Sequence, residues 1–155
     1  MPTERIGDTV VKTYSEELRW QWGREVAFLR CMDNNYQVFP KLLKVGDHSI
    51  TTAWAGETLA RATDVDVERL RRGLSLIMTL LRFHKIIHRD ITVHNVLWNP
   101  ILRAPVLIDF GWSVWDWEDE TPMPVPDVMK QTMHRHDWEQ AAEVLRYMVE
   151  NANDI

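Results

Sequence analysis

The sequence predicts an α+β fold with two lobes, and three observations lead to this expectation. Short β-rich runs surround one amphipathic helix in the first third of the chain. The strongest helical periodicity follows in residues 66–84, and a second helical pattern lies near the C-terminus. A chain of 155 residues is long enough for one compact domain. We therefore expect a single domain with a reduced N-terminal lobe (a short antiparallel sheet plus one helix) over about residues 1–55, and a small, mostly helical C-terminal lobe over about residues 56–155.

The first elements are two strands and a helix. Residues 9–14 form a β-rich run, and residues 4–7 leave room for a strand before it. Ser15 is a potential N-cap for a helix over residues 16–32, because acidic residues follow it in the first turn. The side chains of this segment recur at helical spacing and predict one inner face: Leu18, Trp22, Val26 (or Glu25) and Leu29.

A hairpin and the longest helix come next. Residues 42–45 and 49–53 read as strands joined by Gly46-Asp47, a turn signal. Residues 66–84 then carry apolar side chains three and four positions apart, which predicts an amphipathic helix.

The C-terminal third mixes short strands, a loop and a last helix. Residues 93–98 and 105–108 are apolar runs of strand length. Residues 112–126 hold several prolines and acids, and are predicted to be an irregular surface loop. Asp137 and Gln140 resemble a capping box that opens the last helix, with an inner face of Ala141, Leu145, Met148 and Val149.

Composition limits the classes of function. Lys and Arg number 18 against 23 Asp and Glu, a formal charge of −5, so we expect no nucleic-acid partner. The single cysteine, Cys31, excludes an intrachain disulfide and favours a reducing, cytoplasmic location; it is expected to be a core residue. The longest nearly apolar stretch, residues 74–81, is far shorter than a membrane span.

Two motifs carry the chemistry. His88-Arg89-Asp90 is followed by Asn95 in the pattern H-R-D-x-x-x-x-N, and Asp109-Phe110-Gly111 ends the apolar run after it. With these motifs in this order, the chain resembles the protein-kinase-like fold. The resemblance implies that Asp90 accepts the proton of an acceptor hydroxyl, and that Asn95 and Asp109 hold Mg²⁺ against the phosphates of ATP.

The N-terminal lobe extends the resemblance. Val10-Val11-Lys12 is similar to the strand whose lysine holds the α- and β-phosphates, and Glu25 occupies the place of its helical partner. The segment Thr52, Ala53, Trp54 and Ala55 resembles the hinge that contacts the adenine. Asp137-Trp138 is similar to the family's Asp-x-Trp, whose Asp bonds the backbone near the catalytic loop.

The chain also departs from the family's pattern. No glycine-rich loop precedes Lys12, no Ala-Pro-Glu follows Gly111, and Thr92 stands where many Ser/Thr kinases have a lysine. Arg89 would meet an activating group at Ser113, Thr121 or residues 118–120, but a solvated acidic loop is the favoured interpretation of this segment.

The tryptophans after Gly111 have two readings. Trp112, Trp115 and Trp117 either complete a thin core, which is the favoured reading, or stack on a sugar or anchor a partner chain. In an extended segment, Trp115 and Trp117 would share one side.

These features lead to one expectation with alternatives. We expect an ATP- and Mg²⁺-dependent enzyme resembling a minimal serine/threonine-protein kinase, acting on a protein or small-molecule hydroxyl. The alternatives are a kinase for sugars, antibiotics or lipopolysaccharide cores, a pseudokinase, or a module that a protein partner or a second copy completes.

Overall fold

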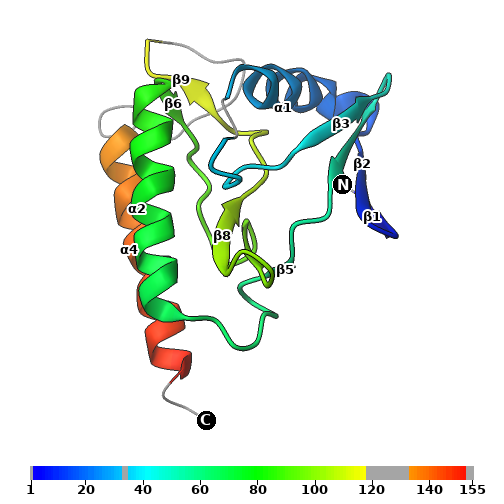
Figure 1. Ribbon diagram of the computed structural model, residues 1–155. Helices are drawn as coiled ribbons and strands as arrows, with labels where there is room; N and C mark the ends of the chain where they lie inside the picture. The colour runs from blue at the N-terminus through cyan, green and yellow to red at the C-terminus, as the bar shows by residue number, and fades with distance from the viewer. Residues whose placement is uncertain (1, 33–34, 118–132, 153–155) are drawn as a thin grey trace.

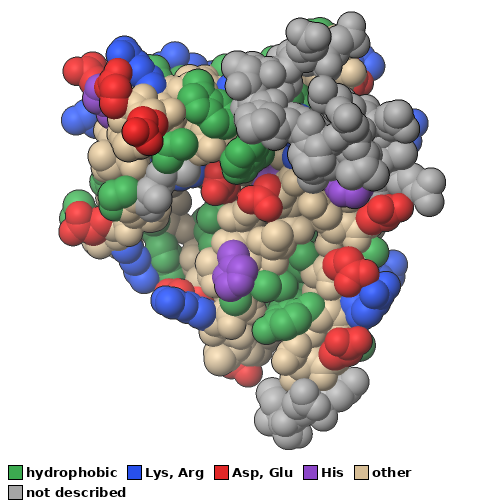
Figure 2. Space-filling view, turned by 180° about the vertical axis from the view of Figure 1, so that it is seen from behind, with side chains coloured by type: hydrophobic (Ala, Val, Ile, Leu, Met, Phe, Trp, Pro, Cys, Tyr) green, Lys and Arg blue, Asp and Glu red, His purple; other side chains and the backbone are tan. Residues whose placement is uncertain are grey.

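The computed structural model is an α+β fold with small antiparallel sheets, and it describes residues 2–32, 35–117 and 133–152. Figure 1 shows the N-terminal sheet with its helix at one end of the molecule and two long helices side by side at the other. Strands and loops from the middle of the chain lie between these two parts. The face drawn in Figure 2 carries acidic and basic side chains interspersed.

The N-terminal sheet contains β1 (Thr3–Ile6), β2 (Thr9–Thr13), β3 (Leu42–Val45) and β4 (Ser49–Ala53). Its strand order is β1-β2-β4-β3, and all neighbours are antiparallel. The bounds of β3 and β4 agree with the sequence prediction, and β1 starts one residue before the predicted segment. The register between β2 and β4 places Lys12 opposite Ile50, whose side chain is buried in the core.

The helix after β2 begins differently from the prediction. A short 3-10 turn, η1 (Glu16–Leu18), precedes α1 (Arg19–Cys31), and the Ser15 side chain makes no capping hydrogen bond. Val26 and Leu29 are buried as predicted, but Cys31 is exposed, so its prediction as a core residue is wrong. Cys31 lies in the last turn, on a different face of the helix from Leu29, and its Sγ donates to the Phe28 carbonyl of its own helix.

The middle of the chain forms two very small sheets. β5 (Glu57–Thr58), β7 (Val96–Asn99) and β8 (Ala104–Leu107) pair in the order β5-β7-β8. β6 (Ile86–Ile87) pairs with β9 (Val114–Trp115), which falls inside the segment predicted to be an irregular loop. Residues 118–126 of that predicted loop, Thr121 included, lie outside the described residues.

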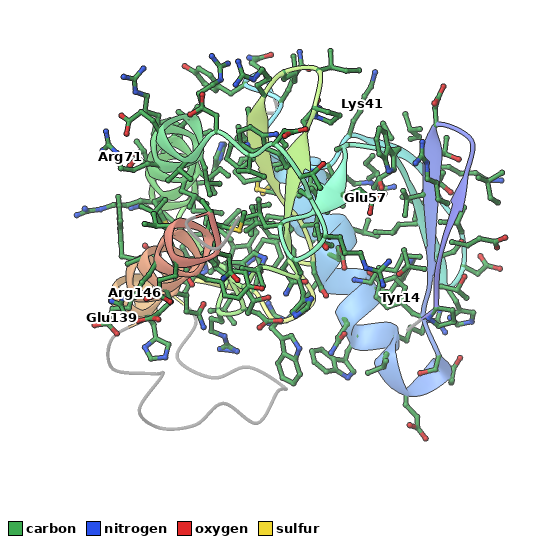
Figure 3. The ribbon with its side chains drawn as sticks, turned by 90° about the horizontal axis from the view of Figure 1, so that it is seen from below. Tyr14, Lys41, Glu57, Arg71, Glu139 and Arg146 are labelled. Atoms are coloured by element: carbon green, nitrogen blue, oxygen red, sulfur yellow. The ribbon has the colours of Figure 1, made fainter. Side chains whose placement is uncertain are left out.

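Two helices cover the C-terminal part. α2 (Val67–Phe83) starts at Asp66, whose side chain accepts from the Arg69 N–H, and buries the predicted apolar face. α4 (Met133–Ala152) packs along it. Figure 3 shows Arg71, Glu139 and Arg146 on the outer sides of these helices, away from the N-terminal sheet.

The inner face of α4 differs from the prediction at Val144 and Val149. Ala141, Val144 and Met148 are buried and Leu145 packs against the core, whereas Val149 is exposed and was wrongly assigned to that face. Within the described residues, no helix has both the length and the apolar composition needed to cross a membrane.

Candidate active site

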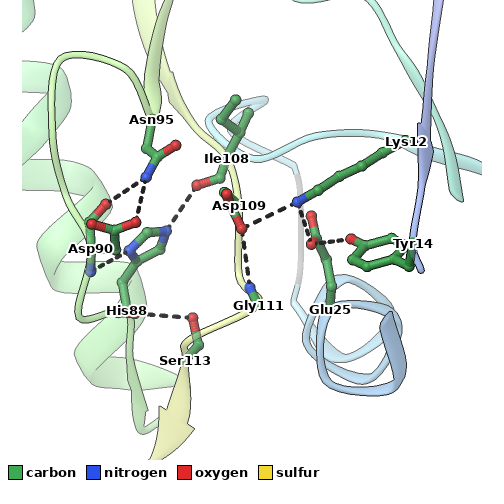
Figure 4. Close-up of polar contacts among 10 residues, drawn as sticks. All are labelled: Lys12, Tyr14, Glu25, His88, Asp90, Asn95, Ile108, Asp109, Gly111 and Ser113. Carbon is green, nitrogen blue, oxygen red and sulfur yellow. Dashed lines mark hydrogen bonds and ion pairs between the residues drawn. The ribbon is translucent and has the colours of Figure 1, made fainter. Parts of the chain in front are cut away.

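Lys12 lies at the centre of a charged cluster between the N-terminal sheet and the C-terminal part. Its Nζ is 3.0 Å from Oε2 of Glu25 on α1 and 3.2 Å from Oδ1 of Asp109, which follows β8 (Figure 4). Glu25 is 3% exposed, and the same Oε2 accepts a hydrogen bond from the buried Tyr14 hydroxyl. The structure thus brings together three residues singled out in the sequence, from three separate elements.

The charges in this cluster set two pKa values. Burial acts to lower the pKa of Lys12, but the carboxylates of Glu25 and Asp109 outweigh it, so the pKa lies above the ordinary value. Burial, followed by the negative charge of Glu25, raises the pKa of Tyr14. Lys12 is therefore a cation and Tyr14 a neutral donor at physiological pH.

Asp90 and Asn95 form a second polar pair. Nδ2 of Asn95 donates to both the carbonyl oxygen and Oδ2 of Asp90, each at 2.9 Å. The Asn95 carbonyl accepts from the N–H of Ile108, one residue before Asp109. The loop that carries Asp90 is in this way joined to the segment that carries Asp109.

His88 supports the backbone of both segments. Its ring is fully buried against Phe110, with 4.9 Å between the ring centroids. Nδ1 accepts from the Asp90 N–H, so Nε2 carries the proton and donates to the Ile108 carbonyl at 2.8 Å. His88 is therefore a neutral structural bridge.

Asp137 and Gln140 hold the Asp90 loop from α4. The two carboxylate oxygens of Asp137 accept from the N–H groups of His88 and Arg89, both at 2.8 Å, as the resemblance implied. Gln140 accepts from the Ile91 N–H and donates to the Arg89 carbonyl. The predicted capping box is wrong, because α4 already begins at Met133 and both side chains bond to the distant loop.

Two residues of the motifs have left-handed backbone. The φ angle is 76° at Arg89 and 64° at Asp109, a conformation that costs non-glycine residues free energy. Oδ1 of Asp137 accepts a hydrogen bond from the Arg89 N–H, and Oδ1 of Asp109 accepts one from the Gly111 N–H. Such strain is concentrated at functional sites, where the surrounding structure maintains it.

A cavity of about 480 Å³ opens beside this cluster, within the size range of small-molecule sites. Lys12, Glu25, Asn95 and Asp109 line it, as does the segment Thr52, Ala53, Trp54 and Ala55 that resembles a hinge. Among the described residues, Asp90 does not line the cavity, but its Oδ2 accepts from Nδ2 of Asn95, which does.

Two side-chain oxygens at the site are suited to a hard cation. Oδ2 of Asp109 and Oδ1 of Asn95 have no hydrogen-bond partner in the described part of the chain. Mg²⁺ prefers one or two protein oxygens together with water and phosphate, so this donor set fits it. Among the described residues, no group of three or more His, Cys, Asp or Glu has the arrangement of a metal centre.

The interpretations of the neighbouring residues need correction. Ser113 is fully buried and its hydroxyl donates to the His88 carbonyl, so it is not an accessible group for Arg89. The ring centroids of Trp115 and Phe28 are 4.7 Å apart, so Trp115 helps complete the core, but Trp112 and Trp117 are 37% and 62% exposed. Trp115 and Trp117 do stack on one another, at 5.0 Å between ring centroids.

Three residues of the site were not predicted from the sequence: Tyr14, Gln140 as an anchor of the Asp90 loop, and Arg5 at the cavity wall. Tyr14 stands two residues after Lys12, so strand alternation could have placed both on one face. The contacts of Gln140 and Arg5 join residues that no local pattern links.

Comparison with known proteins yields a partial similarity. No family model matches the chain. It is 30% identical over 106 residues to serine/threonine-protein kinase C of Synechocystis sp. (strain ATCC 27184 / PCC 6803 / Kazusa). The alignment covers 61% of this chain and 20% of that kinase, so the chain spans about a fifth of the relative's length. The chain is thus similar, over part of its length, to a serine/threonine-protein kinase.

Proposed function

We propose that the chain is a phosphotransferase of protein-kinase-like fold that moves the γ-phosphate of ATP to a hydroxyl, with Mg²⁺ as cofactor. The observation that carries the proposal is the Lys12 ammonium held between Glu25 and Asp109 at a cavity that Asn95 also lines. Phosphoryl transfer requires positioning and charge compensation, which such an arrangement supplies. The similarity to a serine/threonine-protein kinase supports the same reaction class.

Each residue has a role in this mechanism. Lys12 binds the α- and β-phosphate oxygens, and Glu25 orients its ammonium group. Asp109 and Asn95 would hold Mg²⁺, which neutralises charge on the β- and γ-phosphates. Asp90 accepts the proton as the acceptor oxygen bonds to the γ-phosphorus, and the bond from that phosphorus to the bridging oxygen breaks, releasing ADP.

Nucleotide binding is tested first, by thermal unfolding with and without Mg-ATP. Ligand at a hundred times its dissociation constant stabilises by about 2.7 kcal/mol. For a chain of this length that raises Tm by roughly 5–10 °C. Asp109→Asn suits the left-handed backbone at this position but removes the charge, and should abolish the shift. Glu68→Gln, an exposed carboxylate on α2, is the matched control and should keep it. Absence of a shift in the wild type at millimolar Mg-ATP would contradict the proposal.

Transfer itself is tested with Asp90→Asn. This variant should bind Mg-ATP like the wild type and lose phosphate transfer to protein hydroxyls by at least about a hundredfold, because general-base catalysis contributes that much. Generic protein substrates and small sugars, offered in parallel, separate a protein acceptor from a small-molecule one. Retained transfer in Asp90→Asn would remove Asp90 from the role of base.

A further inference from the structure

Arg5 and Trp54 form a cation–π pair on the wall of the cavity. The guanidinium carbon of Arg5 lies 3.8 Å from the centroid of the Trp54 ring, and both residues line the cavity. Nε of Arg5 also donates to the carbonyl of Gly7 at 3.0 Å. The backbone N–H of Trp54 donates to the Asp8 carbonyl at 2.8 Å, so the turn between β1 and β2 contacts both partners.

Strand register places this pair at the end of the cavity away from the phosphate-binding lysine. Arg5 is opposite Val10, and Val10 is opposite Thr52, so these three side chains project from one face of the sheet. Lys12 lies on the same face, two residues further along β2, which is about 6.6 Å. Arg5 therefore crosses β2 above Val10 to reach Trp54.

The remaining donors of Arg5 are available. Its two terminal nitrogens have no hydrogen-bond or ion-pair partner among the residues that the structure describes. A guanidinium group stacks on aromatic faces and donates in its own plane, which suits a heteroaromatic base. Because Trp54 and Gly7 already hold the side chain, little conformational entropy is lost when it contacts a ligand.

We propose that Arg5, positioned by Trp54, is a binding residue for the purine base of the nucleotide. This inference rests on the proposed function: if Lys12 holds the phosphates, the base lies toward Val10 and Thr52, beneath Arg5. The guanidinium has Trp54 against one face and stacks on the base with the other.

The experiment compares Mg-ATP with Mg-tripolyphosphate, which has the phosphates but no base, by calorimetric titration. Arg5→Ala should weaken Mg-ATP binding about 5- to 30-fold, the range of a partly desolvated cation–π contact, and change tripolyphosphate affinity less than twofold. Arg5→Lys keeps the charge but not the planar group, so it should weaken Mg-ATP binding nearly as much as Arg5→Ala does. Trp54→Leu, which removes the support, should weaken Mg-ATP in the same direction.

The outcomes separate this inference from the proposed function. Equal weakening of both ligands, or full recovery in Arg5→Lys, would make Arg5 a general electrostatic contact and overturn the inference. Unchanged Mg-ATP affinity in Arg5→Ala would also overturn it and leave the proposed function standing. Failure of the wild type to bind Mg-ATP would contradict the proposed function itself. Arg71→Ala on α2 controls for the loss of one surface arginine.

Discussion

The hydroxyl of Tyr14 donates a hydrogen bond to Oε2 of Glu25, the same carboxylate oxygen that accepts from Nζ of Lys12. The Lys12 ammonium also lies 5.1 Å from the centroid of the Tyr14 ring. Tyr14 thus contacts both members of the ion pair and connects α1 to the N-terminal sheet. These contacts hold Lys12, Tyr14 and Glu25 together at the site.

The Tyr14 bond predicts a specific pH dependence of stability. Tyr14→Phe should cost about 1.5–3 kcal/mol of unfolding free energy at neutral pH, because it removes a buried hydrogen bond to a charged group. The folded-state pKa values of Tyr14 and Lys12 lie above their ordinary values of 10.0 and 10.5. Their contribution is therefore complete below about pH 10 and is lost as the pH rises further.

Urea unfolding from about pH 7 to about pH 11.5 measures this effect. The difference in unfolding free energy between wild type and Tyr14→Phe should shrink above pH 10 by roughly 1.4 kcal/mol per pH unit, because Tyr14 ionises there only in the unfolded state. Phenolate absorbance supplies a check, because folded Tyr14 should not contribute to it at about pH 11. A difference that stays constant with pH would contradict the prediction.

Lys12 and Glu25 should be energetically coupled. Glu25→Gln leaves the poorly solvated Lys12 ammonium with one fewer carboxylate, so the unfolding free energy should fall by about 3 kcal/mol. Adding Lys12→Met removes that stranded charge, so the double variant should be more stable than the sum of single effects by at least about 1 kcal/mol. Urea unfolding of the four proteins gives the coupling, and strict additivity would disprove the ion pair as a stabilising unit. Both single variants should lose Mg-ATP binding.

Asp137 should stabilise the loop that carries Asp90. Asp137→Ala leaves the buried N–H groups of His88 and Arg89 without their acceptors and should cost at least about 3 kcal/mol. Hydrogen exchange at these two amides should accelerate more than exchange in the N-terminal sheet. Trp138→Ala, at the exposed neighbouring position, should change neither quantity appreciably. If the two amides were as well protected in Asp137→Ala as in the wild type, the Asp137 carboxylate would not hold the loop.

Gly56 should not tolerate a side chain. Its φ is +123°, and a Cβ would lie 1.9 Å from the Trp98 carbonyl oxygen, so Gly56→Ala must shift the backbone. We expect a loss of about 2–4 kcal/mol, seen as a Tm roughly 5–15 °C lower. Gly23→Ala on α1 meets nothing within 4 Å and should stabilise by about 0.5–1 kcal/mol. Opposite signs for the two variants are the expected result; a neutral Gly56→Ala would contradict it.

Local sequence determined the elements whose faces repeat at a fixed period. Strands β3 and β4 and the helix α2 lie where alternation and three-to-four spacing predicted them, because each pattern is contained in a few neighbouring residues. The motif around Asp90 and Asn95 was also visible, because its residues are close together in the chain.

Only the tertiary structure decided what those elements contact. Asp137 and Gln140 read as a local cap, yet they bond to backbone about fifty residues away, because α4 extends beyond them toward its N-terminus and packs beside the loop. A cysteine side chain is often buried, but the position of Cys31 around α1 leaves it exposed. Arg5 meets Trp54 only once β2 and β4 pair. Periodicity specifies which residues share a face, whereas the partner of that face depends on how distant segments pack.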